Sequence, residues 1–308
     1  MKIEFLLCGS PTDAFYSQTA MFRLALDSLG GIYRQARLVL CIGDGDVASV
    51  PDRWRRHLRD VDVLWVPRKA FRDVGSGGDF RYEVLDAGCD LSLLCDADTL
   101  LLAEIDSAAL QRMVERPGIR GVIAHFPPPF GDTAGLGRVG RDPRDFWQAL
   151  SRAVLGRPLP LDHRHTLTPE PVACPFYVNY GVLIGGFEPL RALYDQLRVV
   201  QPKIRRHVGN QFFAQMGVAL ACAAADLATE ALPLRYNFPN DPLADAMHPG
   251  ELADVRFMHY LRTQVFDRHR IFASAADFEA FMRLELGGSN GVFQDRVRRI
   301  TAGSYPFD

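Results

Sequence analysis

Short apolar runs alternate along the chain with stretches in which apolar residues recur every three or four positions. The runs predict buried strands at 3–8, 37–42, 61–66, 91–102, 119–124 and 255–260. The periodic stretches predict helices at 16–29, 52–58, 80–87, 107–115, 143–155, 188–200 and 207–223. Because strands and helices alternate, the sequence predicts an α/β protein whose mostly parallel sheet carries helices on both faces.

Two acidic residues interrupt the apolar run at 91–102, in the sequence Cys95-Asp96-Ala97-Asp98. Side chains two positions apart in a strand point the same way, so both carboxylates would face one side of the strand end. A carboxylate pair in a low-dielectric place is stable when a proton or a cation lies between its members, and oxygen ligands suit Mg²⁺ or Mn²⁺. Taken alone, the pair could equally cap a turn and face water.

Other polar residues stand where strands are predicted to end. Ligands of such sheets bind beyond the carboxyl ends of the strands, so the turns after strands 3–8, 37–42, 61–66 and the Asp96 strand should line one crevice. Asn179 and Gly181 interrupt the apolar segment 176–187, which indicates either a close approach to a ligand or a strand bulge. His259 ends the strand at 255–260 and could join the aspartates on a metal or be a hydrogen-bonded structural histidine. Arg81, at the start of a helix, could bind an anion there or be a surface cation.

Composition limits the functions that remain open. The 308 residues are 48% hydrophobic and 23% charged, and the formal net charge of -2 gives no case for a nucleic-acid partner. A run of arginines reads as solvated helix surface: Arg34, Arg37, Arg53, Arg55, Arg56 and Arg59. Six cysteines without a CxxC pair indicate free thiols in a reducing compartment. No apolar run is long enough to span a bilayer, so we expect a cytoplasmic protein, with peripheral membrane contact left open.

The segment at about 126–175 is rich in proline and glycine and predicts an irregular insertion around the helix at 143–155. It could be a lid, a wall of the acceptor-binding site or a surface loop without a functional role. His163 and His165 lie within it without a nearby third ligand, which favours loop residues over a metal site. The residues at about 275–308 predict a helical cover. No linker divides the chain, so we expect residues 1–308 to form a single domain.

The polar and apolar segments of the chain, taken in sequence order, resemble those of the GT-A fold nucleotide-sugar glycosyltransferases, and most closely those of glycosyltransferase family 8. The resemblance extends from the first strand to about residue 260. The residues that carry it are Arg81, the Cys95-Asp96-Ala97-Asp98 run, 178–182, Asn210-Gln211, 232–238 and Met258-His259-Tyr260.

The resemblance implies a metal-dependent, hexosyltransferase-like enzyme that uses a nucleoside-diphosphate sugar, with a UDP-sugar as the expected donor. Asp96, Asp98 and His259 would hold Mn²⁺ or Mg²⁺ against the diphosphate of the donor. Gln211, Asn210 and Asn179 would lie near the reacting sugar, and retention of configuration is implied. The residues expected to contact the donor nucleotide, its ribose or its phosphates are Cys8, Gly9, Ser10, Asp44, Arg81, Ala97 and Arg262. The acceptor would be an unknown saccharide, lipid or small molecule.

The chain departs from the family pattern at two places. The family has an acidic residue where Asn210 stands, and it follows its late histidine with a glycine and a phosphate-binding lysine, whereas this chain reads Leu261-Arg262-Thr263-Gln264. Arg262 is our expected replacement for the lysine. Two alternatives stay open. One is a sugar-phosphate nucleotidyltransferase, although no glycine-rich, lysine-containing loop follows the first strand. The other is a catalytically weak sugar-nucleotide-binding module.

Overall fold

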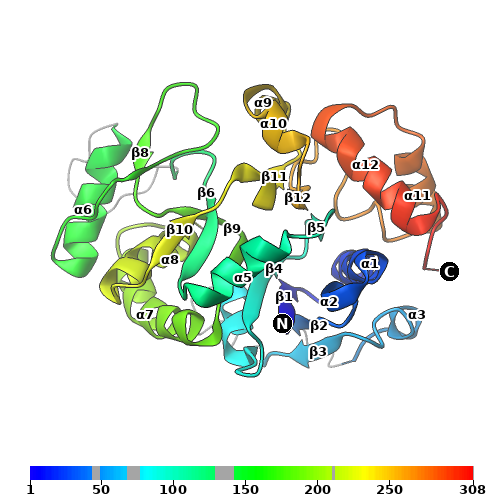
Figure 1. The fold of residues 1–308 in the computed structure, drawn as a ribbon, viewed down its shortest axis with the longest axis horizontal. Helices are drawn as coiled ribbons and strands as arrows, with labels where there is room; N and C mark the ends of the chain where they lie inside the picture. The colour runs from blue at the N-terminus through cyan, green and yellow to red at the C-terminus, as the bar shows by residue number, and fades with distance from the viewer. Residues whose placement is uncertain (44–48, 68–76, 129–141, 210–211, 308) are drawn as a thin grey trace.

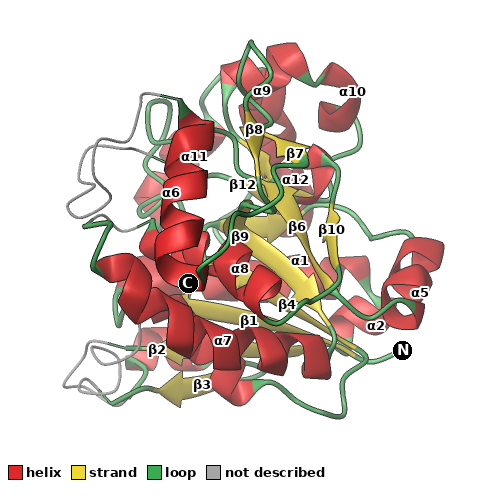
Figure 2. Ribbon diagram, turned by 90° about the vertical axis from the view of Figure 1, so that its left-hand side faces the viewer, coloured by secondary structure: helices red, strands yellow, loops and turns green. Residues whose placement is uncertain are grey.

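The computed structural model describes residues 1–43, 49–67, 77–128, 142–209 and 212–307. The predictions made for Asp44, Asn210 and Gln211 lie outside the described residues. Figure 1 follows the chain from its N-terminus to its C-terminus, and Figure 2 shows strands at the centre with helices packed around them.

Within the described residues the central sheet has seven strands in the order β10-β6-β9-β4-β1-β2-β3. β4, β1, β2 and β3 run parallel, and β10 is parallel to β6, whereas β9 is antiparallel to both of its neighbours. The sheet is therefore mostly parallel, as predicted. Its strands are β1 (Ile3–Gly9), β2 (Arg37–Ile42), β3 (Asp62–Trp65), β4 (Leu91–Asp96), β6 (Ile119–Ile123), β9 (Val178–Gly185) and β10 (Thr229–Ala231).

The predicted strand at 91–102 divides between two sheets. β4 ends at Asp96, and after a turn the chain continues as β5 (Thr99–Leu101) in a separate small sheet of order β11-β12-β5. Its other strands are β11 (Phe238–Pro239) and β12 (Phe257–His259), and a two-stranded hairpin of β7 (His163–Arg164) and β8 (Ala173–Cys174) lies in the insertion. The turn with the two aspartates thus connects the large sheet to the small one.

Helix bounds follow the predictions most closely where local capping signals are strong. α6 (Pro143–Leu155) has the Asp142 side chain as its N-cap and the left-handed Gly156 as its C-cap. The other α-helices are α1 (Asp13–Leu29), α2 (Gly31–Arg34), α3 (Asp52–Arg55), α5 (Ser107–Glu115), α7 (Phe187–Arg205), α8 (Phe213–Ala224), α9 (Pro242–Met247), α10 (Pro249–Leu252), α11 (Ala275–Met282) and α12 (Gly288–Thr301), and the 3-10 helices are η1 (Gly77–Val84) and η2 (Leu234–Tyr236).

Three helix predictions needed correction. The helix expected at 80–87 is the 3-10 helix η1, the helix expected at 207–223 begins at Phe213, and the helix expected at 52–58 ends at Arg55. Neither α3 nor α8 has a side-chain hydrogen bond from its N-cap residue. Without such a local signal, tertiary packing decides where a short helix begins and ends.

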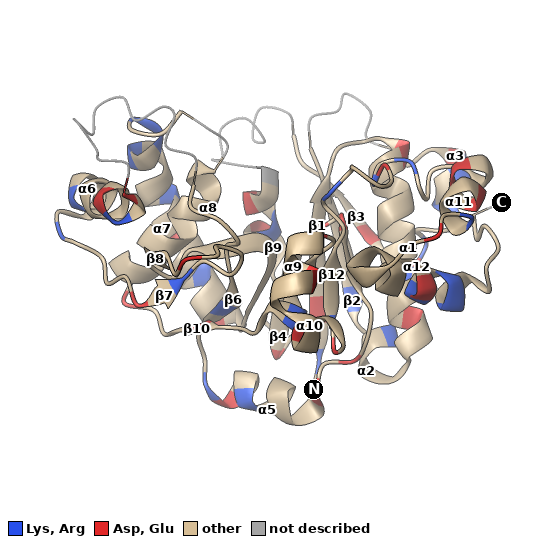
Figure 3. Ribbon diagram, turned by 90° about the horizontal axis from the view of Figure 1, so that it is seen from above, with Lys and Arg blue, Asp and Glu red and all other residues tan. Residues whose placement is uncertain are grey.

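Helices cover both faces of the sheet. Figures 1 and 3 show α6, α7 and α8 on one side of the sheet and α1, α11 and α12 on the other. Each side has its own buried apolar cluster: Phe22 and Phe293 belong to one, and Trp147 and Tyr194 to the other. The apolar faces that the sequence assigned to these helices therefore pack on opposite sides of one shared sheet.

The arginine-rich stretch between residues 34 and 59 is balanced by carboxylates. The ion pairs join Arg37 to Glu4 and Asp62, Arg53 to Asp13, Arg55 to Asp52, and Arg59 to Asp60. Figure 3 shows acidic and basic residues on both sides of the sheet. The interpretation of these arginines as solvated surface fits this pairing. In the described part of the chain, no helix has the length and hydropathy needed to cross a bilayer.

Candidate functional site

Asp96 and Asp98 lie at the carboxyl end of β4, between two strands that also end or begin there. On one side the parallel strand β1 places Cys8 opposite Asp96, and on the other β9 places Val182 opposite Cys95. The turn after β1 and the start of β9 therefore border the aspartates. This is the edge of the sheet at which the strand order predicted a crevice.

The small sheet brings His259 to the same place. β12 pairs antiparallel with β5, with His259 opposite Thr99, and the Tyr260 amide donates to the Asp98 carbonyl at 3.0 Å. Nε2 of His259 consequently lies 3.3 Å from Oδ1 of Asp98. A histidine far along the chain reaches the acidic turn because these two short strands pair.

Asp96, Asp98 and His259 form a group suited to a metal ion. One ligand atom from each lies within 4.8 Å of the other two, and no second group of this kind occurs among the residues that the structure describes. Two carboxylate oxygens and an imidazole nitrogen are a donor set that Mn²⁺ accepts, and Mg²⁺ with additional water. The predicted convergence of the three side chains is confirmed, and their donor atoms fit a divalent cation.

The electrostatics of the three groups are coupled. Burial raises the pKa of the Asp96 carboxyl and Asp98 adds to this, against the opposing charge of Arg81. Burial also opposes ionisation of Asp98, but His259 and Arg268 hold its pKa below the usual value. Burial lowers the pKa of His259, but the charge and hydrogen bond of Asp98 and the charge of Asp96 together outweigh it, so that pKa stands above its ordinary value. The two carboxylates therefore depend on the neighbouring cations, Arg81 for Asp96 and Arg268 for Asp98, for their ionised form.

Arg81 lies behind the aspartates. Its side chain is fully buried, Nη1 lies 3.5 Å from Oδ1 of Asp96, and Nε donates to the Gly78 carbonyl at 3.0 Å. The guanidinium also lies over the ring of Tyr180, 4.9 Å from its centroid. Arg81 is therefore a buried cation beside the metal group rather than a surface charge, and its predicted contact with the donor stays a prediction.

A cavity of about 520 Å³ opens in front of the metal group. Its walls come from the end of β1, from α1, from the acidic turn, from β9, from the start of α8 and from the segment after β12. The lining residues are Cys8, Gly9, Ser10, Phe15, Gln18, Gly78, Asp96, Ala97, Asp98, Asn179, Tyr180, Gly181, Phe212, Gln215, His259, Leu261, Arg268 and His269.

Most of the described residues predicted for the site line this cavity. Cys8, Gly9, Ser10, Ala97 and Asn179 do so together with the metal group. Burial raises the pKa of the Cys8 thiol to about 11, so the sulfur is protonated at neutral pH.

Arg262 is not among the residues that line the cavity. Its Nε pairs with Oδ2 of Asp241 at 2.9 Å, and its backbone exchanges hydrogen bonds with the Asn240 side chain. Its predicted phosphate contact therefore has no support from its position.

Several residues that line the cavity were not predicted from the sequence. Arg268 donates to Oδ2 of Asp98 at 2.5 Å and lies at the cavity wall, but in the sequence it is an arginine in an unpatterned loop. Gln18 is only 1% exposed, and its Oε1 has no hydrogen-bond partner among the described residues. A glutamine on the buried face of a helix is a signal that could have been noticed.

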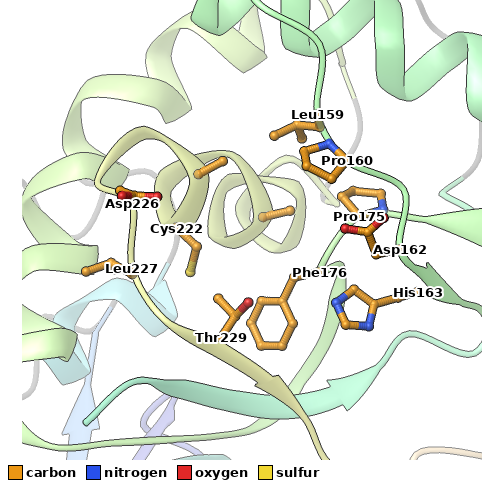
Figure 4. Close-up of a pocket in the computed structure, with 12 residues that line it drawn as sticks. Leu159, Pro160, Asp162, His163, Pro175, Phe176, Cys222, Asp226, Leu227 and Thr229 are labelled. Carbon is orange, nitrogen blue, oxygen red and sulfur yellow. The ribbon is translucent and has the colours of Figure 1, made fainter.

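A second, smaller cavity of about 170 Å³ lies between the insertion and the end of α8, and it shares no lining residue with the first. Figure 4 shows His163 beside the ring of Phe176 and across from Cys222. His165 is buried elsewhere, with Nδ1 2.9 Å from the Ala124 carbonyl. Neither histidine belongs to a metal group among the described residues, and His163 lies in strand β7.

The solved structures that are similar to this chain include the following three. The apo form of mouse xyloside xylosyltransferase 1 matches with a TM-score of 0.51 and 12% identity, over 85% of this chain and 98% of that one. The apo WbbM bifunctional glycosyltransferase matches with a TM-score of 0.56 and 10% identity, over 99% of this chain and 52% of that one. An active-site mutant of LgtC matches with a TM-score of 0.50 and 13% identity, over 84% of this chain and 87% of that one.

No protein-family model and no curated protein sequence matches the chain. At these identities the structural matches establish the fold. The chain has the GT-A fold of the nucleotide-sugar glycosyltransferases, and among them it resembles family 8.

Proposed function

We propose that this protein is a metal-dependent glycosyltransferase that moves a sugar from a nucleoside-diphosphate sugar, with UDP as the expected nucleotide, to a saccharide, lipid or small-molecule acceptor. One observation carries the proposal. The donor atoms of Asp96, at the end of β4, of Asp98, in the turn after it, and of His259, at the end of β12, meet at the carboxyl edge of a GT-A sheet in front of a 520 Å³ cavity. Such edges are where α/β sheets bind their ligands.

In this proposal Asp96, Asp98 and His259 hold Mn²⁺ or Mg²⁺. The bound ion supplies positive charge next to the diphosphate that leaves during transfer, which is the largest electrostatic demand of the reaction. The paired carboxylates provide the charge that retains the ion, and Gly181 leaves the space in which the imidazole of His259 sits beside Asp98.

The remaining walls would hold the donor. Cys8, Gly9 and Ser10 border the cavity at the end of β1, where we place the nucleoside. Gly9 is required there because a β-carbon would lie 2.5 Å from a ring atom of Phe15 on α1. Asn179 lines the opposite wall and would contact the sugar.

For Asn210 and Gln211 we keep the roles near the reacting carbon that the resemblance implies, with retention of configuration. No nucleophile is assigned.

The test measures donor binding and turnover together. Purified protein is screened by thermal shift with UDP-, GDP- and ADP-sugars, with and without Mn²⁺, and release of the nucleoside diphosphate is then followed. A donor at 100 times its dissociation constant stabilises the folded state by about 2.7 kcal/mol. Asp96→Asn and Asp98→Asn should lose both signals. Asp295→Asn, a substitution of an exposed carboxylate in α12, should keep them.

The outcomes separate the alternatives. Binding and nucleoside-diphosphate release that depend on Mn²⁺ and on Asp96 support the proposal. Release of pyrophosphate from a nucleoside triphosphate and a sugar phosphate would instead identify a nucleotidyltransferase. Binding without turnover across a panel of acceptors would identify a sugar-nucleotide-binding module. If both aspartate variants behave like the parent protein, the metal-dependent mechanism is wrong.

A further inference from the structure

Both oxygens of the Asp98 carboxylate already have cationic or potentially cationic neighbours. Oδ1 faces Nε2 of His259 at 3.3 Å, and Oδ2 accepts from Nη1 of Arg268 at 2.5 Å. The Asp98 side chain is only 13% exposed, so little water competes with these contacts. A cation bound by Asp98 through Oδ2 would have to take the place that the Arg268 guanidinium occupies.

The backbone of Arg268 is anchored, but its guanidinium reaches the cavity. The backbone contact is made by Gln18, whose Nε2 donates to the Arg268 carbonyl at 3.0 Å. In the side chain, Nη1 donates to the Leu261 carbonyl at 3.1 Å as well as to Asp98. The side chain is 29% exposed, and its Nη2 has no hydrogen-bond partner within the part of the chain that the structure describes. Turning the guanidinium from Asp98 toward a ligand in the cavity would break its contacts with Asp98, the Leu261 carbonyl and Nε2 of His269, and would leave the backbone in place.

The charges of the site balance without any ligand. Asp96 and Asp98 contribute two negative charges, Arg81 and Arg268 contribute two positive ones close to them, and His259 is counted as neutral, the form in which it binds a metal. A divalent cation alone would leave the site with an excess of two positive charges, and the diphosphate of a donor alone would leave two negative ones. Only the two ligands together restore the balance, and charge imbalance in a partly buried site is costly.

We propose that Arg268 couples the binding of the metal to the binding of the diphosphate. In the empty site Arg268 pairs with Asp98 and opposes metal binding; when the metal takes Asp98, the released guanidinium pairs with the diphosphate oxygens. Arginine suits this exchange because its planar fork matches carboxylate and phosphate alike. Because linkage is reciprocal, each ligand then raises the affinity for the other by the same factor. This inference rests on the proposed function, which supplies the two ligands.

Calorimetry with Mn²⁺ and UDP tests the coupling directly, without any acceptor or turnover. Arg268→Met keeps an unbranched side chain but removes the charge. It should bind Mn²⁺ alone about tenfold more tightly than the parent protein, and it should bind UDP in the presence of Mn²⁺ about tenfold more weakly. Arg268→Lys restores the charge without the fork and should recover part of both effects.

Arg270→Met is the matched control. Arg270 stands two residues away, is 68% exposed and pairs with Asp277 outside the cavity, so its substitution should leave both affinities unchanged. Thermal unfolding of every variant verifies that the chain is folded. If Arg268→Met does not fold, Arg268→Gln takes its place in the same titrations.

The failure of this inference differs from the failure of the proposed function. If Arg268→Met binds Mn²⁺ with unchanged or reduced affinity while both proteins bind UDP with Mn²⁺, the coupling role of Arg268 is wrong and the metal site stands. If the parent protein binds neither Mn²⁺ nor UDP under any condition, both are wrong. Equal effects of Arg268→Met and Arg270→Met would also overturn the inference, because a general change in surface charge would then explain them.

Discussion

The imidazole of His259 lies against Gly181 so closely that a β-carbon on residue 181 would overlap its Nδ1 and Cε1 atoms. Gly181 belongs to β9 and His259 to β12, which are strands of different sheets. The two residues meet because β9 pairs with β4 and β12 pairs with β5, on either side of the acidic turn. The missing side chain at position 181 therefore sets where His259 can stand relative to Asp98.

Gly181→Ala should push the His259 ring away from Asp98 and weaken metal binding. Groups that orient a metal-binding histidine typically contribute tenfold to a hundredfold in metal affinity, so we expect a loss of at least about tenfold for Mn²⁺, measured by calorimetry. Gly250→Ala is the control, since no atom lies within 4 Å of a β-carbon at that position. Unchanged Mn²⁺ affinity in Gly181→Ala would show that His259 is not a ligand.

Removing the buried cation Arg81 should destabilise the fold. Arg81→Gln leaves Asp96 without its neighbouring charge and removes a guanidinium that is fully buried, so a loss of about 3 kcal/mol in the free energy of unfolding is expected. Urea denaturation measures it. The matched variant Arg55→Gln breaks an exposed ion pair with Asp52 and should cost less than about 1 kcal/mol. Similar losses in both variants would contradict a special role for burial at Arg81.

His125 should make the protein sensitive to acid. Burial, reinforced by nearby His259 and Arg262, lowers the pKa of His125 from 6.5 to about 3. Between these two values the unfolded chain binds a proton that the folded chain does not, so stability falls as the pH drops below 6.5. The slope contributed by this one residue is of the order of 1 kcal/mol per pH unit.

Urea denaturation of the parent protein and of His125→Asn between pH 4 and pH 8, at about one-unit steps, measures this contribution. The asparagine amide can still donate to Oγ1 of Thr166, the partner of His125 Nδ1 at 2.8 Å. Its stability should therefore depend less on pH over the acid range. Parallel pH profiles for the two proteins would rule out His125 as a source of the acid sensitivity.

Gly9→Ala should disturb the packing of α1 on the end of β1. The new β-carbon would lie 2.5 Å from Cδ1 of Phe15, and forcing an extra methyl group into a packed position costs about 1–3 kcal/mol. Because Phe15 and Gly9 both line the cavity, UDP affinity should fall as well. Chemical denaturation and UDP titration measure the two effects. A variant with normal stability and normal UDP affinity would show that Phe15 moves aside freely.

Local pattern was enough to predict many of the elements. β2, α5 and α6 have the bounds that periodicity indicated, because an apolar run or an amphipathic stretch with its own caps specifies an element from within. The position of Asp96 at a strand end and of His259 at another could also be read from where apolar runs stop. The arrangement of residues 1–308 as one domain stays a prediction.

Contacts between distant segments could not be read from the sequence. Arg268 donates to Asp98 across 170 residues of chain, and no local pattern marks either partner for the other. The same holds for Arg262, which was expected to bind phosphate but pairs with Asp241. It also holds for β9, which runs antiparallel to its two neighbours, β4 and β6.

The sequence by itself determined the alternation of strands and helices, the buried character of β1, β2 and β4, and the two acids at a strand end. These depend on side-chain periodicity, which is a property of neighbouring residues. The tertiary structure alone decided that His259 stands beside Asp98, that Gly181 makes room for it and that Arg268 competes for the same carboxylate. Those relations arise from strand pairing and loop packing between remote segments, which one-dimensional spacing does not encode.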